Sequence, residues 1–232
     1  MARPRRETIR KEIADEIKTA ARKQMGEHGT AGLSLRAVAR DLGITAPAIY
    51  NYFPRLEDLI TALIVDAFTA LAIAMETACE ETQSETSIPK IEAMLFAYRR
   101  WAIEHPVDFQ LIYGNPIPGY EAPAELTSPL ALRPFFGIFQ LYAQAVQTGE
   151  IEVPHEYKDV PAPIAAYLIF WRSHTGVDIP DELICTLMTG WARIHGLVML
   201  ELFHHTQPVV GDAEALYRYE IRAFHTRLGV AN

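Results

Sequence analysis

Apolar residues recur every three or four positions through most of the chain, which is the spacing that places side chains on one face of an α-helix. The first such pattern covers about residues 6–28 and carries Ile9, Ile13 and Ile17 on one face. No segment shows the short alternating runs between turns that are typical of an all-β protein. We therefore predict an all-α fold, with a long helix that begins near Leu56.

Residues 34–53, with the sequence SLRAVARDLGITAPAIYNYF, have the layout of a helix-turn-helix. Ser34 suits the N-cap of a first helix, and Gly43 suits the left-handed backbone that ends it. Thr45 suits the N-cap of a second helix, and Pro47 fits the first turn of that helix because the N–H it lacks has no partner there. The apolar residues that we expect to turn inward are Leu35, Val38, Leu42, Ile49 and Phe53.

The outward-facing residues of this segment and its flank are candidates for contacting DNA: Ser34, Arg36, Thr45, Ala46, Pro47, Tyr50, Asn51, Tyr52 and Arg55. Hydroxyl and guanidinium groups suit phosphate oxygens, Ala46 or Pro47 suits a thymine methyl group, and Asn51 suits either a base or the backbone. A helix-glycine-helix corner can instead be plain core scaffolding, and its spacing alone does not separate the two interpretations.

The distribution of charge favours the DNA-binding interpretation. The whole chain has a net charge of −8, which by itself argues against a nucleic-acid partner. Residues 1–55, however, carry 11 Lys and Arg against 6 Asp and Glu, whereas the remainder of the chain has a balance of −13. Phosphate binding needs clustered positive charge, and only the first part of the chain supplies it.

Residues from about 6 to 65 resemble the DNA-binding domain of the tetracycline-repressor (TetR) family. The residues that carry the resemblance are Ala21, Gly29, Ser34, Leu35, Val38, Ala39, Gly43, Tyr50, Phe53, Glu57 and Leu59. The resemblance implies an all-α homodimeric repressor of a palindromic operator, whose long fourth helix couples a ligand pocket to the two recognition helices. Where the family often has a phosphate-contacting Lys, this chain has Leu56, so we leave Leu56 out of the site and expect Arg55 to substitute.

The C-terminal half is similar to the WHG-type regulatory domain of the same family, through Trp191, His195 and Gly196 in the stretch GWARIHGLVMLELF. We therefore divide the chain into a three-helix DNA-binding domain, residues 1–55, and a helical ligand-sensing and dimerisation domain, residues 56–232. The last two helices each carry an apolar stripe, and the resemblance implies that two chains bury these stripes in a four-helix interface.

Aromatic residues in the C-terminal half suggest a pocket for a small apolar or aromatic effector that releases DNA. Our candidates for contacting this ligand are Trp101, Phe139, Trp171, Trp191 and His195. Aromatic side chains more often fill cores than sites. His195 has two interpretations, because a polar tip on an apolar helix either finds a partner within the core or faces a cavity.

Other classes of function are disfavoured by the sequence. There is no GxSxG motif, glycine-rich phosphate loop or paired Cys and His, so we predict no enzymatic activity and no cofactor. His195, Glu201, His204 and His205 lack the order of a zinc motif, and we predict no metal site. A DNA-independent dimeric scaffold remains an alternative, and it requires residues 34–55 to be idle.

The chain is expected to be cytoplasmic. Its basic N-terminus leads into no apolar segment of a secretory signal. The longest apolar stretch, from Leu59 to Met75, is interrupted by Asp66, so we predict no membrane passage. Cys79 and Cys185 are far apart and lack a CxxC pattern, which fits a reducing compartment.

Overall fold

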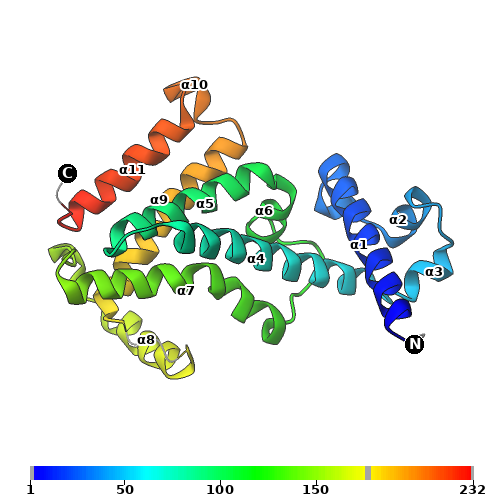
Figure 1. The fold of residues 1–232 in the computed structure, drawn as a ribbon, viewed down its shortest axis with the longest axis horizontal. Coiled ribbons are helices and arrows are strands. Elements are labelled where there is room, and N and C mark those ends of the chain that lie inside the picture. Colours follow the sequence, from blue (N-terminus) through cyan, green and yellow to red (C-terminus); the bar gives the residue numbers. More distant parts are fainter. Residues whose placement is uncertain (1–2, 176–178, 231–232) are drawn as a thin grey trace. The chain divides into compact units, whose positions relative to one another are not determined.

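The computed structural model describes residues 3–175 and 179–230, and every regular element in this part of the chain is helical (Figure 1). In chain order the elements are α1 (Arg3–His28), the 3-10 turn η1 (Thr30–Gly32), α2 (Leu35–Asp41), α3 (Ala46–Tyr50), α4 (Leu56–Glu81), α5 (Ser87–Glu104), α6 (Pro106–Tyr113), α7 (Ala124–Thr148), η2 (His155–Tyr157), α8 (Ala162–Thr175), α9 (Asp181–Leu202), α10 (Gln207–Val210) and α11 (Ala213–Arg227). The predicted all-α fold is confirmed.

The packing divides the chain into two compact units. The first contains Met1–Ala70 and His105–Arg133, and the second contains Leu71–Glu104 and Pro134–Asn232. Helices α4 and α7 each contribute residues to both units. We predicted a functional division after residue 55, between DNA binding and ligand sensing, and that division stays a prediction. The two units described here are defined differently, by which parts of the chain pack together.

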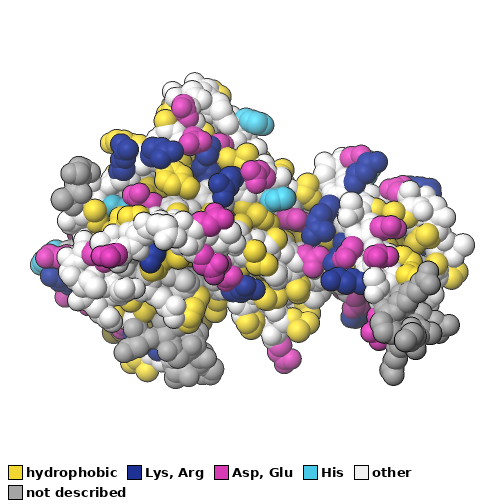
Figure 2. All heavy atoms as spheres, viewed as in Figure 1, with side chains coloured by type: hydrophobic (Ala, Val, Ile, Leu, Met, Phe, Trp, Pro, Cys, Tyr) yellow, Lys and Arg dark blue, Asp and Glu magenta, His cyan; other side chains and the backbone are white. Residues whose placement is uncertain are grey.

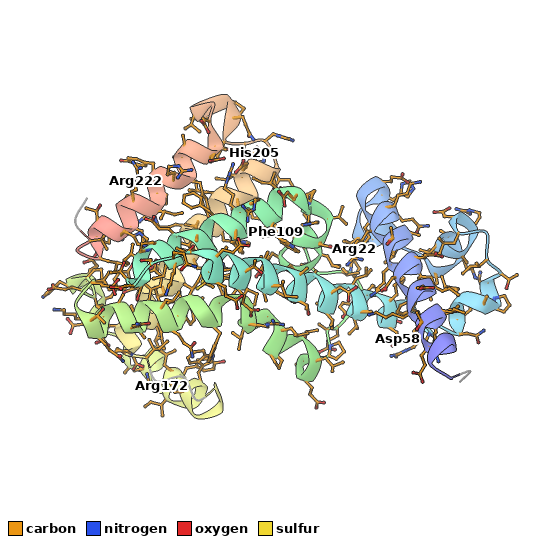
Figure 3. All side chains as sticks on the ribbon, viewed as in Figure 1. Arg22, Asp58, Phe109, Arg172, His205 and Arg222 are labelled. Atoms are coloured by element: carbon orange, nitrogen blue, oxygen red, sulfur yellow. The ribbon has the colours of Figure 1, made fainter. Side chains whose placement is uncertain are left out.

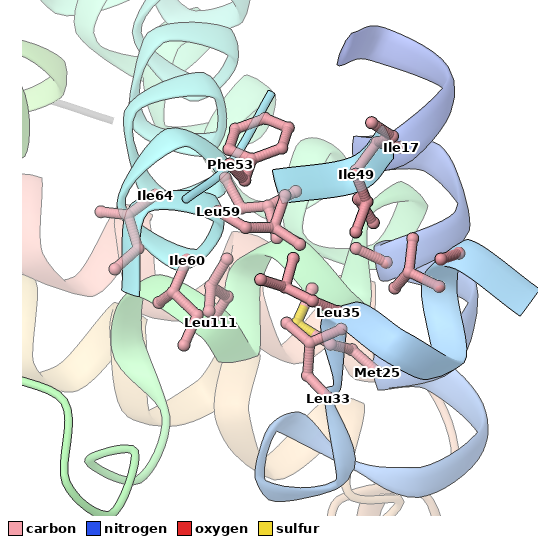
Figure 4. Close-up of a cluster of buried hydrophobic side chains, with 14 of the residues drawn as sticks. Ile17, Met25, Leu33, Leu35, Ile49, Phe53, Leu59, Ile60, Ile64 and Leu111 are labelled. Atoms are coloured by element: carbon pink, nitrogen blue, oxygen red, sulfur yellow. The ribbon is translucent and has the colours of Figure 1, made fainter. Parts of the chain in front are cut away.

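The first unit is built around one cluster of buried apolar residues from α1, α2, α3, α4 and α6 (Figure 4). Ile17 of α1, Ile49 of α3 and Leu59 of α4 are inaccessible to solvent in this cluster. Burial of such side chains is the main force holding short helices together. The predicted apolar face of α1 extends less far than expected, because Ile13 is only half-buried and Ile9 is 46% exposed.

Ion pairs attach α1 to other helices of the first unit. Arg22 of α1 donates from Nε to both carboxylate oxygens of Asp108 in α6, at 2.8 and 3.0 Å. Lys18, also of α1, places its Nζ atom 2.7 Å from Oδ2 of Asp66 in α4. Figure 3 labels Arg22 on α1. Asp108 is largely buried, so its pairing with Arg22 offsets the desolvation of its charge. Together these pairs hold α1, α4 and α6 in one body.

Polar contacts within the second unit join segments that are far apart in the sequence. Tyr217 of α11 donates from its hydroxyl to the Leu95 carbonyl of α5 at 2.8 Å. His225, only 3% exposed, bonds through Nε2 with the Tyr142 hydroxyl at 3.0 Å and lies with Nδ1 3.2 Å from Glu92 Oε1. These bonds satisfy buried polar groups that burial would otherwise destabilise, and they fix α5, α7 and α11 relative to one another.

Helices α4 and α9 are long and apolar enough to cross a membrane by length and composition alone. Core helices of folded proteins pass the same test, and α4 places Leu59, Leu63 and Leu71 out of contact with solvent. Burial of these side chains in the core accounts for much of the apolar character of α4. The expected absence of a membrane passage stays a prediction.

The close approach of α9 and α11 at Gly190 generates a stability prediction. A Cβ atom at Gly190 would lie 2.7 Å from Cζ of Phe224, whose ring also packs edge-on against Tyr142. Gly190→Ala therefore forces a buried ring to move, and we expect the free energy of unfolding to fall by about 1–2 kcal/mol. Denaturation by urea, followed by far-UV circular dichroism, measures this change.

Gly26→Ala is the control, because a Cβ atom there would meet only Val107 Cγ2 at 3.4 Å, an ordinary contact. Replacing glycine by alanine within helix α1 should raise the free energy of unfolding by about 0.5–1 kcal/mol. If Gly190→Ala stabilises the protein as much as Gly26→Ala does, the ring of Phe224 has room to move and the close-packing argument is wrong.

Candidate nucleic-acid interface and internal cavity

The turn between α2 and α3 has the geometry that the sequence predicted. Gly43 has a φ of 66°, in the left-handed region. The Ile44 amide donates to the Ala39 carbonyl at 3.0 Å, and the Gly43 amide donates to the Arg40 carbonyl at 3.1 Å. This pair of bonds is the Schellman arrangement, which satisfies the last carbonyls of α2 and redirects the chain into α3.

Ser34 and Thr45 occupy the N-cap positions of α2 and α3, as predicted, but neither side chain accepts a capping hydrogen bond. Both residues have extended backbones, and their carbonyls accept the first helical bonds, from the Val38 and Ala48 amides. The two predicted N-cap positions are therefore confirmed, although neither hydroxyl makes the bond that usually accompanies them. Pro47 does lie in the first turn of α3.

Most of the nine candidate DNA contacts are accessible to solvent. Arg36, Thr45, Pro47, Tyr50, Asn51 and Arg55 are exposed, whereas Ser34, Ala46 and Tyr52 are half-buried. Tyr50 is 40% exposed although its neighbour Ile49 is completely buried. Helix α3 thus buries one face and leaves the other open, which is the arrangement that a recognition helix needs.

The charged groups near α3 are partly engaged with one another. Arg55 donates from its NH2 group to Asp58 Oδ1 at 2.8 Å, and its backbone amide donates to Asp58 Oδ2 at 3.0 Å. Asp58 lies at the start of α4 (Figure 3), and the Arg55 guanidinium holds the pKa of this carboxyl below its ordinary value. Arg10 of α1 donates to the Asn51 carbonyl at 3.2 Å, at the end of α3.

Positive and negative side chains are interspersed over α1 on the face drawn in Figure 2. The charged side chains of α1 that are coloured in that view therefore do not form a single basic field on that face. Contacts with phosphate then depend on individual side chains, such as Arg36 and Arg55, that extend into solvent.

The second unit contains an apolar cavity of about 40 Å³ between α4, α5, α7, α9 and α11. Of the five predicted ligand contacts, Phe139 and Trp191 line this cavity. Trp101 is buried in α5 and Trp171 is half-buried in α8, and neither is among the lining residues described. Sequence reasoning did not select Met75, Leu95 or Ile138, which line the cavity but follow the same helical pattern as ordinary core residues.

His195 has a partner in the core. Its Nδ1 atom lies 2.7 Å from the hydroxyl of Tyr98, and its ring lies against Trp191 with centroids 5.0 Å apart. Burial lowers the pKa of His195, so that its imidazole is neutral at pH 7. Tyr98 and Trp191 line the cavity, and His195 therefore lies directly behind its wall.

The part of the chain that the structure describes contains no group of three or more His, Cys, Asp or Glu side chains placed to hold a metal ion. In the same part, Arg99 donates from Nε to Glu201 Oε2 at 2.8 Å. Glu201, which we weighed as a metal ligand, is thus engaged in an ion pair between α5 and α9.

Comparison with known proteins identifies both halves of the chain. Residues 17–63 match the family model described as bacterial regulatory proteins of the tetR family, and residues 91–224 match the model for a tetracyclin repressor-like C-terminal domain. The chain is 32% identical over 228 residues to the HTH-type transcriptional regulator Rv1816 of Mycobacterium tuberculosis, covering 95% of this chain and 97% of that protein. Mb1846 of Mycobacterium bovis matches equally well.

Solved structures agree with these matches. The regulatory protein SCO4313 superposes with a TM-score of 0.77 at 28% identity, covering 94% of this chain and 97% of that one. A protein from Rhodococcus sp. RHA1 superposes with a TM-score of 0.69 at 20% identity, covering 94% and 95%, which shows the shared fold. On the family models, the relatives and the helix-turn-helix geometry together, the chain belongs to the TetR family of transcriptional regulators.

Proposed function

We propose that this regulator is a cytoplasmic repressor that binds a palindromic operator as a homodimer and leaves it when a small apolar or aromatic ligand binds in the second unit. It acts by binding, without catalysis. The observation that carries the proposal is helix α3, which buries Ile49 and presents Tyr50 and Asn51 to solvent within a closed helix-turn-helix. The internal cavity supports the ligand-dependent part.

The side chains around α3 divide into contacts that position the protein and contacts that read bases. The hydroxyls of Ser34 and Thr45, at the N-termini of α2 and α3, suit phosphate oxygens as hydrogen-bond donors. Tyr50, Tyr52 and Arg36 suit the backbone as well. Ala46 and Pro47 suit a thymine methyl group, and Asn51 suits a base edge or a phosphate. Arg55 must exchange part of its bond with Asp58 for a phosphate contact.

Exposed apolar surface on α9 and α11 supports dimerisation through these two helices. Met188, Leu200 and Phe203 of the α9 segment are exposed, and Tyr219 of α11 is 69% exposed. Burial of such side chains against a second copy removes apolar surface from water. A two-fold dimer also provides two recognition helices, because one helix covers too few bases for useful specificity.

The cavity favours an apolar or aromatic ligand, because its wall contains Phe135, Phe139, Trp191 and aliphatic side chains. A volume of about 40 Å³ is less than the roughly 150 Å³ of a cavity that accepts benzene, so a ligand must displace side chains as it enters. RolR, a protein of the same fold, has been solved in complex with resorcinol. Helix α4 carries Met75 of the cavity wall and begins six residues after α3 ends, so it is the element through which displacement would act.

The DNA interface predicts a specific salt dependence. The logarithm of the binding constant should fall by about 0.9 per released counterion for each tenfold rise in salt. Arg36→Ala should weaken binding to all sequences and reduce this slope by about 1, because one phosphate contact is lost. Fluorescence anisotropy of a labelled operator at several salt concentrations measures both quantities.

Arg100→Ala provides the matched control, since Arg100 is an exposed arginine on α5 of the second unit. It should leave both the affinity and the slope unchanged. A flat salt response of the native protein, or equal effects of the two arginine substitutions, contradicts phosphate binding by α2.

Tyr50→Ala should weaken operator binding, as measured by the same fluorescence anisotropy, while light scattering should show that the dimer stays intact.

Ligand release predicts reciprocal coupling between the two sites. Resorcinol, benzyl alcohol and cyclohexanol are suitable probes, because they combine an apolar body with little polar surface. A probe that binds the cavity should bind free protein about 5–150-fold more tightly than operator-bound protein, and should weaken operator binding by the same factor. Calorimetric titration of the probe into free and operator-bound protein measures the ratio of the two affinities. Trp191→Ala alters the cavity wall, and His195→Ala removes the partner of Tyr98 behind that wall.

Equal affinity of a bound probe for free and operator-bound protein rules out the release mechanism, because a ligand without preference shifts no equilibrium. Failure of all three probes to bind contradicts the apolar ligand class. If a probe binds and Trp191→Ala and His195→Ala both leave its affinity unchanged, the two residues are structural and the release mechanism survives.

A further inference from the structure

The first unit contains a hollow of its own, separate from the internal cavity of the second unit. It has a volume of about 330 Å³ and lies between α4, the end of α6, the connection at residues 114–123 and the start of α7. Its apolar wall includes Ile64 and Phe68 of α4 and Leu111 and Ile112 of α6. Ligand sites in proteins commonly have volumes from about 300 Å³, so this cleft is large enough for a small molecule without rearrangement.

The chemistry of the lining restricts the ligand class. Among the described residues that line the cleft, none is Asp, Glu, Lys, Arg or His. The polar side chains that line it are those of Asn115, Tyr120, Thr127 and Ser128. A charged ligand would lose hydration in this cleft without gaining an opposite charge, which is unfavourable. The cleft therefore suits a neutral molecule with an apolar body.

Hydrogen bonding defines the polar group that the ligand should carry. The hydroxyl of Thr61 donates to the Glu57 carbonyl at 2.8 Å, and its oxygen lies 2.9 Å from the hydroxyl of Tyr120. Since the proton of Thr61 is used, Tyr120 must donate to Thr61. The phenolic oxygen of Tyr120 then keeps acceptor capacity, so it suits a ligand that donates a hydrogen bond, such as an alcohol or a phenol.

The cleft is continuous with the core that holds the helix-turn-helix. Ile64, Phe68 and Leu111 line the cleft and also belong to the buried cluster that contains Ile49 of α3. Helix α6 is further attached to α1 through the bidentate pair of Arg22 with Asp108. A molecule in the cleft therefore contacts the same packed body that positions α3.

From these observations we propose a second ligand site in the first unit, at which the cleft binds a small uncharged molecule with an apolar body and one hydrogen-bond donor. The Tyr120 oxygen accepts the bond from the donor, and the α4 and α6 side chains pack against the apolar body. This site is independent of the ligand release proposed for the internal cavity.

The test uses the full-length protein with labelled isoleucine methyl groups, because each site has its own reporters. Ile64, Ile112 and Ile117 line the cleft, whereas Ile138, Ile194 and Ile221 line the internal cavity. Titration with 2-phenylethanol should shift the methyl resonances of the cleft, with a Kd of about 1 mM for a molecule of this size. The methyl ether of the same alcohol should bind the cleft about 5-fold more weakly, since it cannot donate to Tyr120. Phenylacetate should leave the cleft resonances unshifted.

Two substitutions separate a true site from general solvent effects. Ala131→Leu places a larger side chain on the cleft wall and should abolish the cleft shifts, whereas Ala124→Leu, at an exposed α7 position outside the lining, should preserve them. Tyr120→Phe keeps the shape of the wall and should reduce the affinity for 2-phenylethanol to that of its ether. It provides the same test if Ala131→Leu does not fold.

The proposal is overturned if 2-phenylethanol shifts no cleft resonance, or if the shifts persist in Ala131→Leu and the affinity is unchanged in Tyr120→Phe. Binding of phenylacetate as tight as that of the alcohol overturns the assigned ligand class. Shifts confined to Ile138, Ile194 and Ile221 place the ligand in the internal cavity, which overturns the second site and leaves the proposed function standing. Cleft shifts without any internal-cavity shift support the second site alone.

Discussion

The burial of Ile49 is the interaction on which the candidate DNA interface depends. Helix α3 is only five residues long, and an isolated helix of that length is not stable in water. Complete burial of one isoleucine contributes about 1.5–3 kcal/mol, and Phe53 adds a second anchor immediately after the helix. The direction in which Tyr50 and Asn51 point is thus set by the core behind them and not by helix propensity.

That core is larger than the helix-turn-helix itself. Leu111 of α6 belongs to it, and the buried Asp108 one turn earlier pairs with Arg22 of α1. A domain of about 55 residues buries a smaller fraction of its surface than a larger domain does, so a three-helix domain gains stability by adding neighbouring helices to its core. This explains why residues 105–133 pack with the N-terminal helices although residues 71–104 separate the two segments in the sequence. Any ligand that touches α6 consequently touches the scaffold of α3.

The two hollows in the molecule differ in what they can accept. The internal cavity of the second unit is apolar and small, and behind its wall the Tyr98 hydroxyl and His195 satisfy each other. Binding there requires side chains to move, and such movement is what links a ligand to a change of conformation. The cleft of the first unit is open and larger, and the Tyr120 hydroxyl on its wall can accept a hydrogen bond. The internal cavity therefore suits a ligand that switches the conformation, whereas the cleft suits a ligand that binds directly to a preformed surface.

The sequence by itself determined the all-α fold, the position of the helix-turn-helix and the inward-facing residues Val38 and Ile49, because helical periodicity and the requirements of Gly43 and Pro47 are local. It also led to the TetR family through residues at fixed spacing. Only the tertiary structure decided the absence of capping bonds at Ser34 and Thr45, the partner of His195, and the place of Trp191, but not of Trp101 or Trp171, in the cavity wall. These depend on which helices meet, and contacts such as Tyr98 with His195 join residues 97 positions apart, a distance at which no local pattern specifies the pairing.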